Sequence, residues 1–432
     1  MKTNKTLLST AVALSLLGTT SMANAAGFQL AEYSATGLGR AYAGEAAMAD
    51  NASAQWRNPA MLTYLEGTQV SVGAIYVNPN IDVKGDVNFN GSTSSASSDD
   101  FAHDAIIPNF YLSHQYNDKF AIGLAFGTNY GMETDLGKGF GASHFGNEAS
   151  VTTMEANLNA AYKIHESISV GGGIRYILGE GSFGATTPQI NALNQPQGTA
   201  LKYMEGDDTA WGWQIGTAWQ INDNNRIGFS YKSEVELKLE GHAEGLGFGF
   251  GTVYPNKTRD NGYMYLNLPA TAELASFHQV TDQLALHASF NWTDWSSFEK
   301  LEAHLDTAGT HMVKVENWED NYRFAVGATY QLEPKLALRT GIAYDTSAVS
   351  DKNRTITIPE TDRTWLSIGA TYDWNKDLSL DAGFTYIIAK DAPIVESRGY
   401  SSDDAAEAVG GQFVGETTGN VWLIGVQANY RF

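Results

Sequence analysis

The side chains that could carry out chemistry in this sequence match no catalytic pattern. Histidine, serine and aspartate residues are scattered along the chain, but no phosphate-binding loop, serine nucleophile turn or HExxH motif is present. Cysteine is absent, which excludes thiolate catalysis, thiolate metal sites and disulfides. A barrel hydrolase would need serine, histidine and aspartate to meet at one rim, and sequence does not reveal such a meeting. We expect no enzyme, no metal and no cofactor.

The first residues have the composition of a secretory signal peptide, which we assign to residues 1–25. Lys2 and Lys5 precede an apolar run over residues 7–18, and an Ala-Asn-Ala site follows at residues 23–25. This run is too short to span a bilayer comfortably.

The net charge of the chain excludes one class of binding partner. The formal net charge is −21, and loss of the two leader lysines makes the mature chain −23. A strongly acidic protein repels phosphate backbones, so we exclude nucleic acid as a partner.

Most of the chain after residue 67 alternates apolar and polar residues with the period of a β-strand. In residues 420–432 one face carries Trp422, Ile424, Val426, Ala428, Tyr430 and Phe432. The other face is mostly polar, and the pattern returns in residues 283–292 and 378–388. Segments of this kind, with aromatic residues near their ends, are typical of transmembrane β-barrels. A soluble sandwich, in contrast, would have no use for exposed aromatic residues at its strand ends.

Short and long connections alternate along the chain. Turns such as residues 222–224 and 375–377 are short, whereas the connections 183–208 and 397–418 are long. Outer-membrane barrels show this asymmetry between their periplasmic and external ends. We therefore predict an all-β transmembrane barrel of about 14 antiparallel strands over residues 68–432, in the outer membrane of a Gram-negative bacterium.

The segment 26–67 does not alternate and is rich in small residues. At its end Asn58 can cap a helix, Pro59 suits the first helical position, and Ala60 follows. A barrel of this size has a lumen that its own side chains cannot fill, and some large barrels are plugged. We predict that this segment is a small, mostly helical plug, or hatch, in the lumen.

Several motifs resemble the FadL family of outer-membrane long-chain fatty-acid transporters. The resemblance begins with "AGFQLAEYSATGLGRAYAGEAAMADNASAQWRNPAMLTYL", which contains the Asn-Pro-Ala motif. It continues through "GTNYGMET", "LNLPATAEL", "YRFAVGATY" and "NRTITIPETDRTWLSIGATY" along the mature chain. The resemblance implies a fourteen-stranded barrel that binds an acyl chain in an apolar tunnel and releases it sideways through a gap in the wall.

In the family this gap lies at an inward kink of the third strand, and Asn129, Tyr130 and Gly131 match that segment. Glycine and asparagine tolerate unusual φ angles, so the strand can bend or bulge there. Moving an acyl chain from hydrocarbon into water costs about 0.8 kcal/mol of transfer free energy for each methylene, so sideways release into the membrane is favoured.

Two further ligand contacts follow from the resemblance. The family places its mature N-terminus beside the ligand, which makes Phe28 a candidate contact, with packing inside the hatch as the alternative. Basic groups of the upper barrel meet the carboxylate in the family, and Lys314 lies in the matching loop, although an exposed loop lysine is the simpler interpretation. The segment "LGEGSFGATT" lacks the basic residue expected there.

Three functions stay open at this point. The first is passive uptake of long-chain fatty acids, and the second is uptake of other hydrophobic compounds such as aromatic hydrocarbons. The third is a barrel that serves as an enzyme or receptor. The expected surroundings are outer-membrane lipid and lipopolysaccharide, and we expect a monomer.

Overall fold

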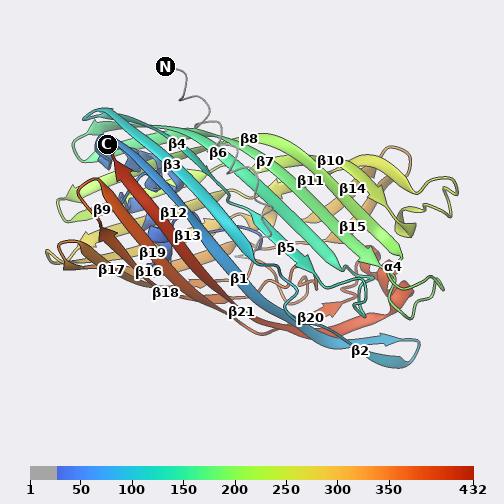
Figure 1. Ribbon diagram of the computed structural model, residues 1–432. Helices are drawn as coiled ribbons and strands as arrows, with labels where there is room; N and C mark the ends of the chain where they lie inside the picture. The colour runs from blue at the N-terminus through green and yellow to red at the C-terminus, as the bar shows by residue number, and fades with distance from the viewer. Residues whose placement is uncertain (1–26) are drawn as a thin grey trace, which may run out of the picture.

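The computed structural model describes residues 27–432, and residues 68–432 form a closed antiparallel β-barrel of fourteen strands (Figure 1). The barrel closes because β1 (Thr68–Phe89) pairs with β3 (Ala105–Asn117) on one side and with β21 (Gln412–Arg431) on the other. The predicted fold class is confirmed. The predicted signal peptide lies outside the described residues.

Some wall strands are continuous and others are broken into two segments. The other continuous strands are β6 (Glu148–His165), β7 (Ile168–Thr186), β8 (Ala200–Asn222), β17 (Leu336–Asp345) and β18 (Arg363–Asp373). The broken strands are β4 (Phe120–Gly127) with β5 (Gly131–Asp135), β9 (Asn225–Lys232) with β10 (Val235–Glu244), β11 (Arg259–Leu268) with β12 (Thr271–Gln279), β13 (Leu284–Thr293) with β14 (Lys300–Leu305), β15 (Gly309–Val315) with β16 (Asn321–Glu333), and β19 (Leu378–Ala389) with β20 (Ala392–Glu396). One further strand, β2 (Ser92–Ser98), folds back on the outer end of β1.

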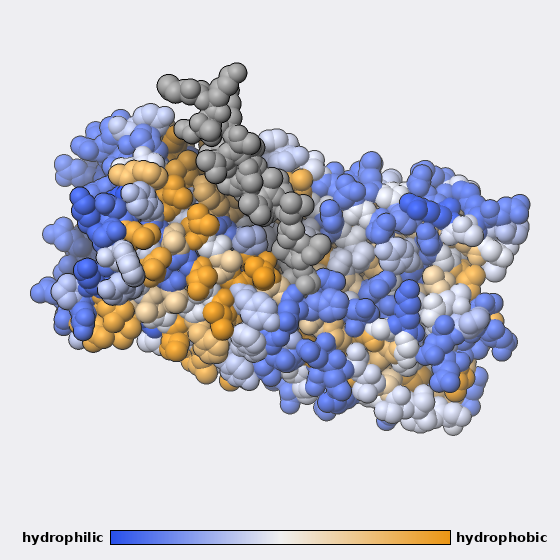
Figure 2. All heavy atoms as spheres, viewed as in Figure 1, coloured by the Kyte–Doolittle hydropathy of each residue, from blue (hydrophilic) through white to orange (hydrophobic). Residues whose placement is uncertain are grey.

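Side chains of the wall alternate between outside and inside as the sequence pattern predicts. In β21, Ile424 and Val426 are 47% and 58% exposed, whereas Leu423 and Gln427 are buried in the interior. Figure 2 shows hydrophobic residues gathered over the left part of the barrel, with hydrophilic residues at its left end and over its right half. An apolar band with polar borders is the lipid-facing belt of a transmembrane barrel.

The connections at the outer end are shorter than the sequence analysis predicts, because strands extend into them. Of the predicted connection 183–208, only residues 187–199 lie between β7 and β8. Two short helices occupy other connections, η3 (Leu246–Phe248) and α4 (Ser401–Gly410). A third, η4 (Trp295–Ser297), lies in the break between β13 and β14. Backbone N–H and C=O groups beyond the membrane still need hydrogen-bond partners, and strands that continue to pair with their neighbours supply them.

Residues 27–67 lie inside the barrel and contain only short helices (Figure 1). These are α2 (Ala35–Leu38), η1 (Glu45–Ala47), α3 (Ala54–Arg57) and η2 (Pro59–Tyr64). Asn58 caps η2 as predicted, and the helix that it caps is a 3₁₀ helix. Leu65 ends η2 in an extended conformation, three residues before the start of β1. The stretch between Asn58 and Leu65 therefore has room for only one or two tight helical turns. No helix within residues 27–432 is both long and apolar enough to cross a membrane.

Glycines in the wall let the N-terminal segment approach the barrel backbone closely. A Cβ atom at Gly171 of β7 would lie 2.5 Å from the Ala60 nitrogen. A Cβ at Gly216 of β8 would lie 1.9 Å from Asn58 Oδ1. Only glycine leaves room for such backbone contact, so the segment and the wall are shaped to each other.

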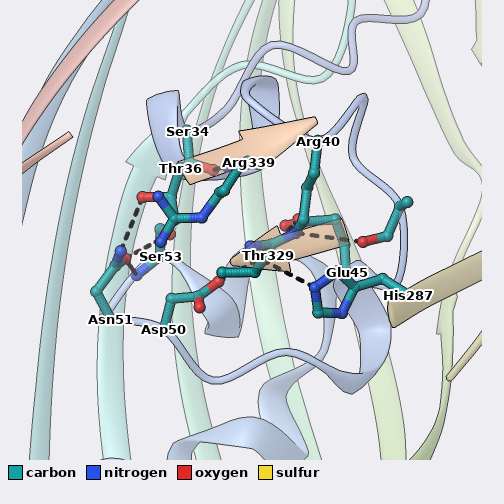
Figure 3. A network of polar contacts seen from close by, with 12 residues as sticks. Ser34, Thr36, Arg40, Glu45, Asp50, Asn51, Ser53, His287, Thr329 and Arg339 are labelled. Carbon is teal, nitrogen blue, oxygen red and sulfur yellow. Dashed lines mark hydrogen bonds and ion pairs between the residues drawn. The ribbon is translucent and has the colours of Figure 1, made fainter. Parts of the chain in front are cut away.

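Buried polar contacts also attach the segment to the wall (Figure 3). Arg40 Nη2 lies 2.6 Å from Glu45 Oε1 and 2.7 Å from Asp50 Oδ2. Asn51 Nδ2 donates to Thr36 Oγ1 over 3.0 Å, and Thr36 Oγ1 in turn donates to a carboxylate of β19. If the segment moved, members of this buried network would lose their partners and leave charges unpaired, which is costly. The network therefore holds the segment in one position.

Candidate functional site

The third wall strand is interrupted between β4 and β5, and the wall loses its pairing there. Pairing of β3 with β4 ends at Phe110 and Phe126, and the next backbone contact across this boundary joins His103 to Glu133. Between these points residues 105–109 pair with β1 and, in the part of the chain that the structure describes, with no strand on the other side. The barrel wall therefore has a gap in its hydrogen-bond ladder at the predicted position.

The interruption is a β-bulge against β6. Gly127 pairs with Glu155 and Gly131 pairs with Thr152, so three residues of the broken strand face two residues of β6. The extra residue bends the strand, as bulges do. The prediction of a bulge is confirmed, but the reason given for it is wrong, because neither Asn129 nor Gly131 has a positive φ angle.

The N-terminal segment pairs with the bulge in place of β3. Gln29 and Tyr130 form an antiparallel bridge. On either side of it, Leu30 N donates to Asn129 O and Gly131 N donates to Phe28 O, both over 2.7 Å. The backbone groups freed by the bulge are thus satisfied from inside the barrel.

Phe28 fills a pocket of aromatic rings beside the bulge. Its ring centroid lies 4.6 Å from that of Trp295, 5.6 Å from Phe298, 6.0 Å from Trp318 and 6.2 Å from Tyr130. The rings of Trp295, Phe298 and Tyr130 meet Phe28 edge to face, a favourable arrangement for aromatic groups. Phe28 is buried, so its side chain closes this end of the interior.

An apolar interior connects this pocket to the outer end of the barrel. The buried cluster that contains Phe28 also includes Met132, Ile177, Met204, Leu237, Leu239, Leu305, Phe248 and Phe250. The last two belong to the outer connection between β10 and β11. Two cavities of about 20 and about 40 Å³ border the described interior, the second next to Gln29 and Leu30. Each has room for no more than a few waters.

The Asn-Pro-Ala motif lies away from the aromatic pocket. Asn58 Oδ1 accepts from Ala60 N over 2.9 Å, and Asn58 Nδ2 donates to Ala46 O over 2.6 Å and to Thr217 O over 3.0 Å. Pro59 and Ala60 pack where glycines thin the wall. These contacts hold the N-terminal segment to β8 and do not place the motif beside the bulge.

Lys314 lies at the end of β15 and is buried, so the expectation of an exposed loop lysine is wrong. Its Nζ donates to Glu396 Oε1 and to Phe145 O, each over 3.1 Å. Nearby, Trp318 Nε1 donates to Glu316 Oε2 over 3.0 Å, and burial raises the pKa of Glu316. The structure thus brings Phe28 together with the three bulge residues but leaves Lys314 in an ion pair.

Sequence reasoning missed two groups of residues at this site. The first is the tryptophan pair Trp295 and Trp318, which lies in the breaks between β13 and β14 and between β15 and β16, where alternation gives no guidance. The second is a polar cluster behind the bulge, in which Arg175 binds Glu155 through two hydrogen bonds of 2.8 Å, and Lys232 donates to Asn129 Oδ1 over 3.1 Å. The sequence did contain a signal for the second group, because its charged residues occupy lumen-facing positions of strands that alternate.

Comparison with known proteins agrees with this architecture. A family model described as outer membrane protein transport protein (OMPP1/FadL/TodX) matches residues 16–432. The chain is 34% identical over 461 residues to the long-chain fatty acid transport protein of Escherichia coli O6:H1, covering 100% of this chain and 99% of that protein. It is 36% identical over 427 residues to outer membrane protein P1 of Haemophilus influenzae, covering 90% and 91% respectively.

Solved structures share the fold. A Pseudomonas aeruginosa FadL homologue superposes with a TM-score of 0.83 at 24% identity, covering 94% of this chain and 100% of that chain. The Pseudomonas putida toluene transporter TodX gives a TM-score of 0.69 at 16% identity, with the same coverage. The family consists of transport proteins rather than enzymes. This chain therefore belongs to the OMPP1/FadL/TodX family and is a Gram-negative outer-membrane transporter of hydrophobic compounds.

Proposed function

We propose that this protein carries long-chain fatty acids passively across the outer membrane. The observation that supports this proposal is the apolar cluster that runs from Phe250 at the outer end to Phe28 beside the wall gap. Such an interior suits an acyl chain, because each methylene gains about 0.8 kcal/mol on leaving water. The names of curated relatives, identical at 33 to 34% along the whole chain, support the same substrate.

We further propose that the ligand leaves sideways at the bulge. Residues 27–30 fill the wall gap, so their withdrawal would remove Phe28 from its pocket and expose the gap at the same time. The Asn58, Pro59 and Ala60 motif would hold the rest of the segment on β8, which limits the movement to the first residues. Release into lipid spares the acyl chain contact with water.

We also propose that Lys314 contacts the carboxylate head group of the ligand, as the family resemblance predicts. Its ammonium group is paired with Glu396, so a ligand carboxylate would have to replace that partner. A buried lysine at the entrance to an apolar interior suits this exchange, because a second carboxylate can take the place of the first. We also propose that the protein is monomeric and that its polar outer half meets lipopolysaccharide (Figure 2).

A second candidate is uptake of monoaromatic hydrocarbons. The ring pocket around Phe28 could stack a small aromatic ligand, and structural neighbours include proteins named as toluene transporters. The likeness to those neighbours, at 16 to 17% identity, concerns the fold only.

Uptake by living cells tests both candidates. Cells that lack their own outer-membrane fatty-acid transporter would be supplied with labelled oleate or labelled toluene, with and without this chain. Oleate uptake above background supports the proposed function. Toluene uptake without oleate uptake would replace it with the second candidate, and absence of both would reject the two together.

A further inference from the structure

Lys232, the last residue of β9 before the break to β10, is a buried lysine with no carboxylate partner among residues 27–432. The residue is 5% exposed, its Nζ donates to the neutral amide oxygen of Asn129, and it lies 4.5 Å from the ring centroid of Trp56. Across residues 27–432, no carboxylate oxygen lies within the 4.0 Å ion-pair limit of this Nζ. Burial with only neutral partners disfavours the ammonium form of a lysine, and a bound anion would restore that form, so the site favours an anion.

The nearest acid of this cluster is already occupied. Glu155 accepts both Arg175 contacts, and Asn129 Nδ2 donates to Glu155 Oε2 over 2.6 Å. Arg175 Nη1 also donates to the Ser233 carbonyl over 2.9 Å. Arg175 and Glu155 therefore pair with each other, and Lys232 is the basic residue of this cluster that has no carboxylate partner within residues 27–432.

Among residues 27–432, unpartnered amide atoms also lie on the nearby strands β6 and β8. Asn157 is fully buried, and neither its Oδ1 nor its Nδ2 has a hydrogen-bond partner within residues 27–432. It lies two residues from Glu155 on the same inward face of β6, opposite Arg175 in the register with β7. Gln214, which pairs with Lys232 in the register of β8 and β9, has an unpartnered Oε1. Buried amides of this kind are rare in folded proteins unless a ligand or water completes them.

We propose that Lys232 and Asn157 form an inner carboxylate site at the wall gap. The ammonium group of Lys232 and the Nδ2 group of Asn157 would each donate to one carboxylate oxygen of a long-chain monocarboxylic acid. Because Asn129 belongs to the bulge and also accepts from Lys232, this places the head group beside the opening through which the chain leaves. The site would select acids over uncharged hydrocarbons. It rests on the proposed function, of which it specifies the exit step.

The test compares oleate with oleyl alcohol, an uncharged probe of equal chain length. Binding to the purified full-length barrel is measured by displacement of a fluorescent fatty acid, for wild type, Lys232→Met and Lys232→Arg. Lys335→Met, at an exposed periplasmic turn, is the matched control. We expect Lys232→Met to weaken oleate binding about tenfold or more and oleyl alcohol binding less than twofold, since charged hydrogen bonds have this value. Lys232→Arg should retain most of the oleate affinity.

An equal loss for both probes, or unchanged oleate binding in Lys232→Met, overturns the proposal. Heat-modifiable electrophoretic mobility checks that each variant barrel is folded. If Lys232→Met does not fold, Asn157→Leu replaces it, with a selective loss of oleate affinity as the expected result and an unselective loss as the contrary one. Failure of the proposed function would be seen separately, as absent oleate uptake by wild type in cells.

Discussion

The backbone nitrogen of Gly131 donates to the carbonyl oxygen of Phe28 over 2.7 Å, so the break in the barrel wall is closed by the N-terminal segment. The same residue, Phe28, places its side chain in the aromatic pocket. One short stretch of chain therefore seals the wall and ends the apolar interior. In the proposed lateral release, withdrawal of that stretch would open the gap and uncover the aromatic pocket at the same time.

Truncation of Phe28 should loosen this seal. Phe28→Ala removes packing against four rings, and buried Phe-to-Ala changes cost about 3 to 5 kcal/mol. Local opening should then become at least about 100-fold more frequent, which hydrogen exchange at the amides of Leu30 and Gly131 measures. Phe126→Ala, on the exposed face beside the gap, is the control and should leave this exchange unchanged. Equal exchange in Phe28→Ala and wild type would mean that the pocket does not hold the seal.

Deletion of Asn129 should straighten the wall strand. Removal of one residue leaves two residues facing two on β6, which restores regular pairing and keeps Gly131 outward and Met132 inward. Pairing with β3 could then continue past Phe126, and oleate uptake should fall to background in a folded barrel. Asn129→Ala keeps the bulge without its side chain and should retain uptake. Full uptake by the deletion variant would remove the bulge from the transport route.

The barrel was predictable because alternation in strands such as β21 directly reports which residues face lipid. The position of the bulge was predictable from the resemblance of Asn129, Tyr130 and Gly131 to the kinked strand of the family, not from the φ preferences of these residues. Its partner was not predictable, since nothing near Phe28 signals pairing with the bulge. The burial of Lys314 was also beyond the sequence, because Glu396 comes from a distant part of the chain. Contacts between remote segments are set by closure of the barrel, which local pattern does not encode.

Acid should loosen one outer connection. Burial lowers the pKa of His144 to about 4, and its Nε2 lies 2.8 Å from Gly411 O. The neutral ring is favoured in the folded state, so the stability it gives is complete above its ordinary pKa of 6.5 and is lost as pH falls toward 4. About 2 kcal/mol should be lost at pH 5. Protease cleavage within residues 136–147 on intact cells should rise between pH 7.5 and 5 in wild type but not in His144→Gln, and equal pH dependence in both would contradict this.

A mutant cycle should show that Asn58 and Gly216 are fitted to each other. Asn58→Ala removes a helix cap and two donated hydrogen bonds, at a cost of about 2 to 3 kcal/mol. Gly216→Ala places a methyl group where Asn58 Oδ1 lies, so it should loosen the same contact. In the double variant the small side chain at position 58 leaves room for that methyl group, and its cost should be smaller than the sum by about 1 kcal/mol or more.

Hydrogen exchange over residues 58–64 measures each corner of this cycle. Gly172→Ala serves as the control, because a Cβ there meets no atom closer than 3.5 Å and should change nothing. Additive costs of Asn58→Ala and Gly216→Ala would show that the two positions act independently. A coupled pair would instead mean that wall glycines and the Asn-Pro-Ala motif together fix where the N-terminal segment is anchored, which leaves residues 27–30 as the part free to move.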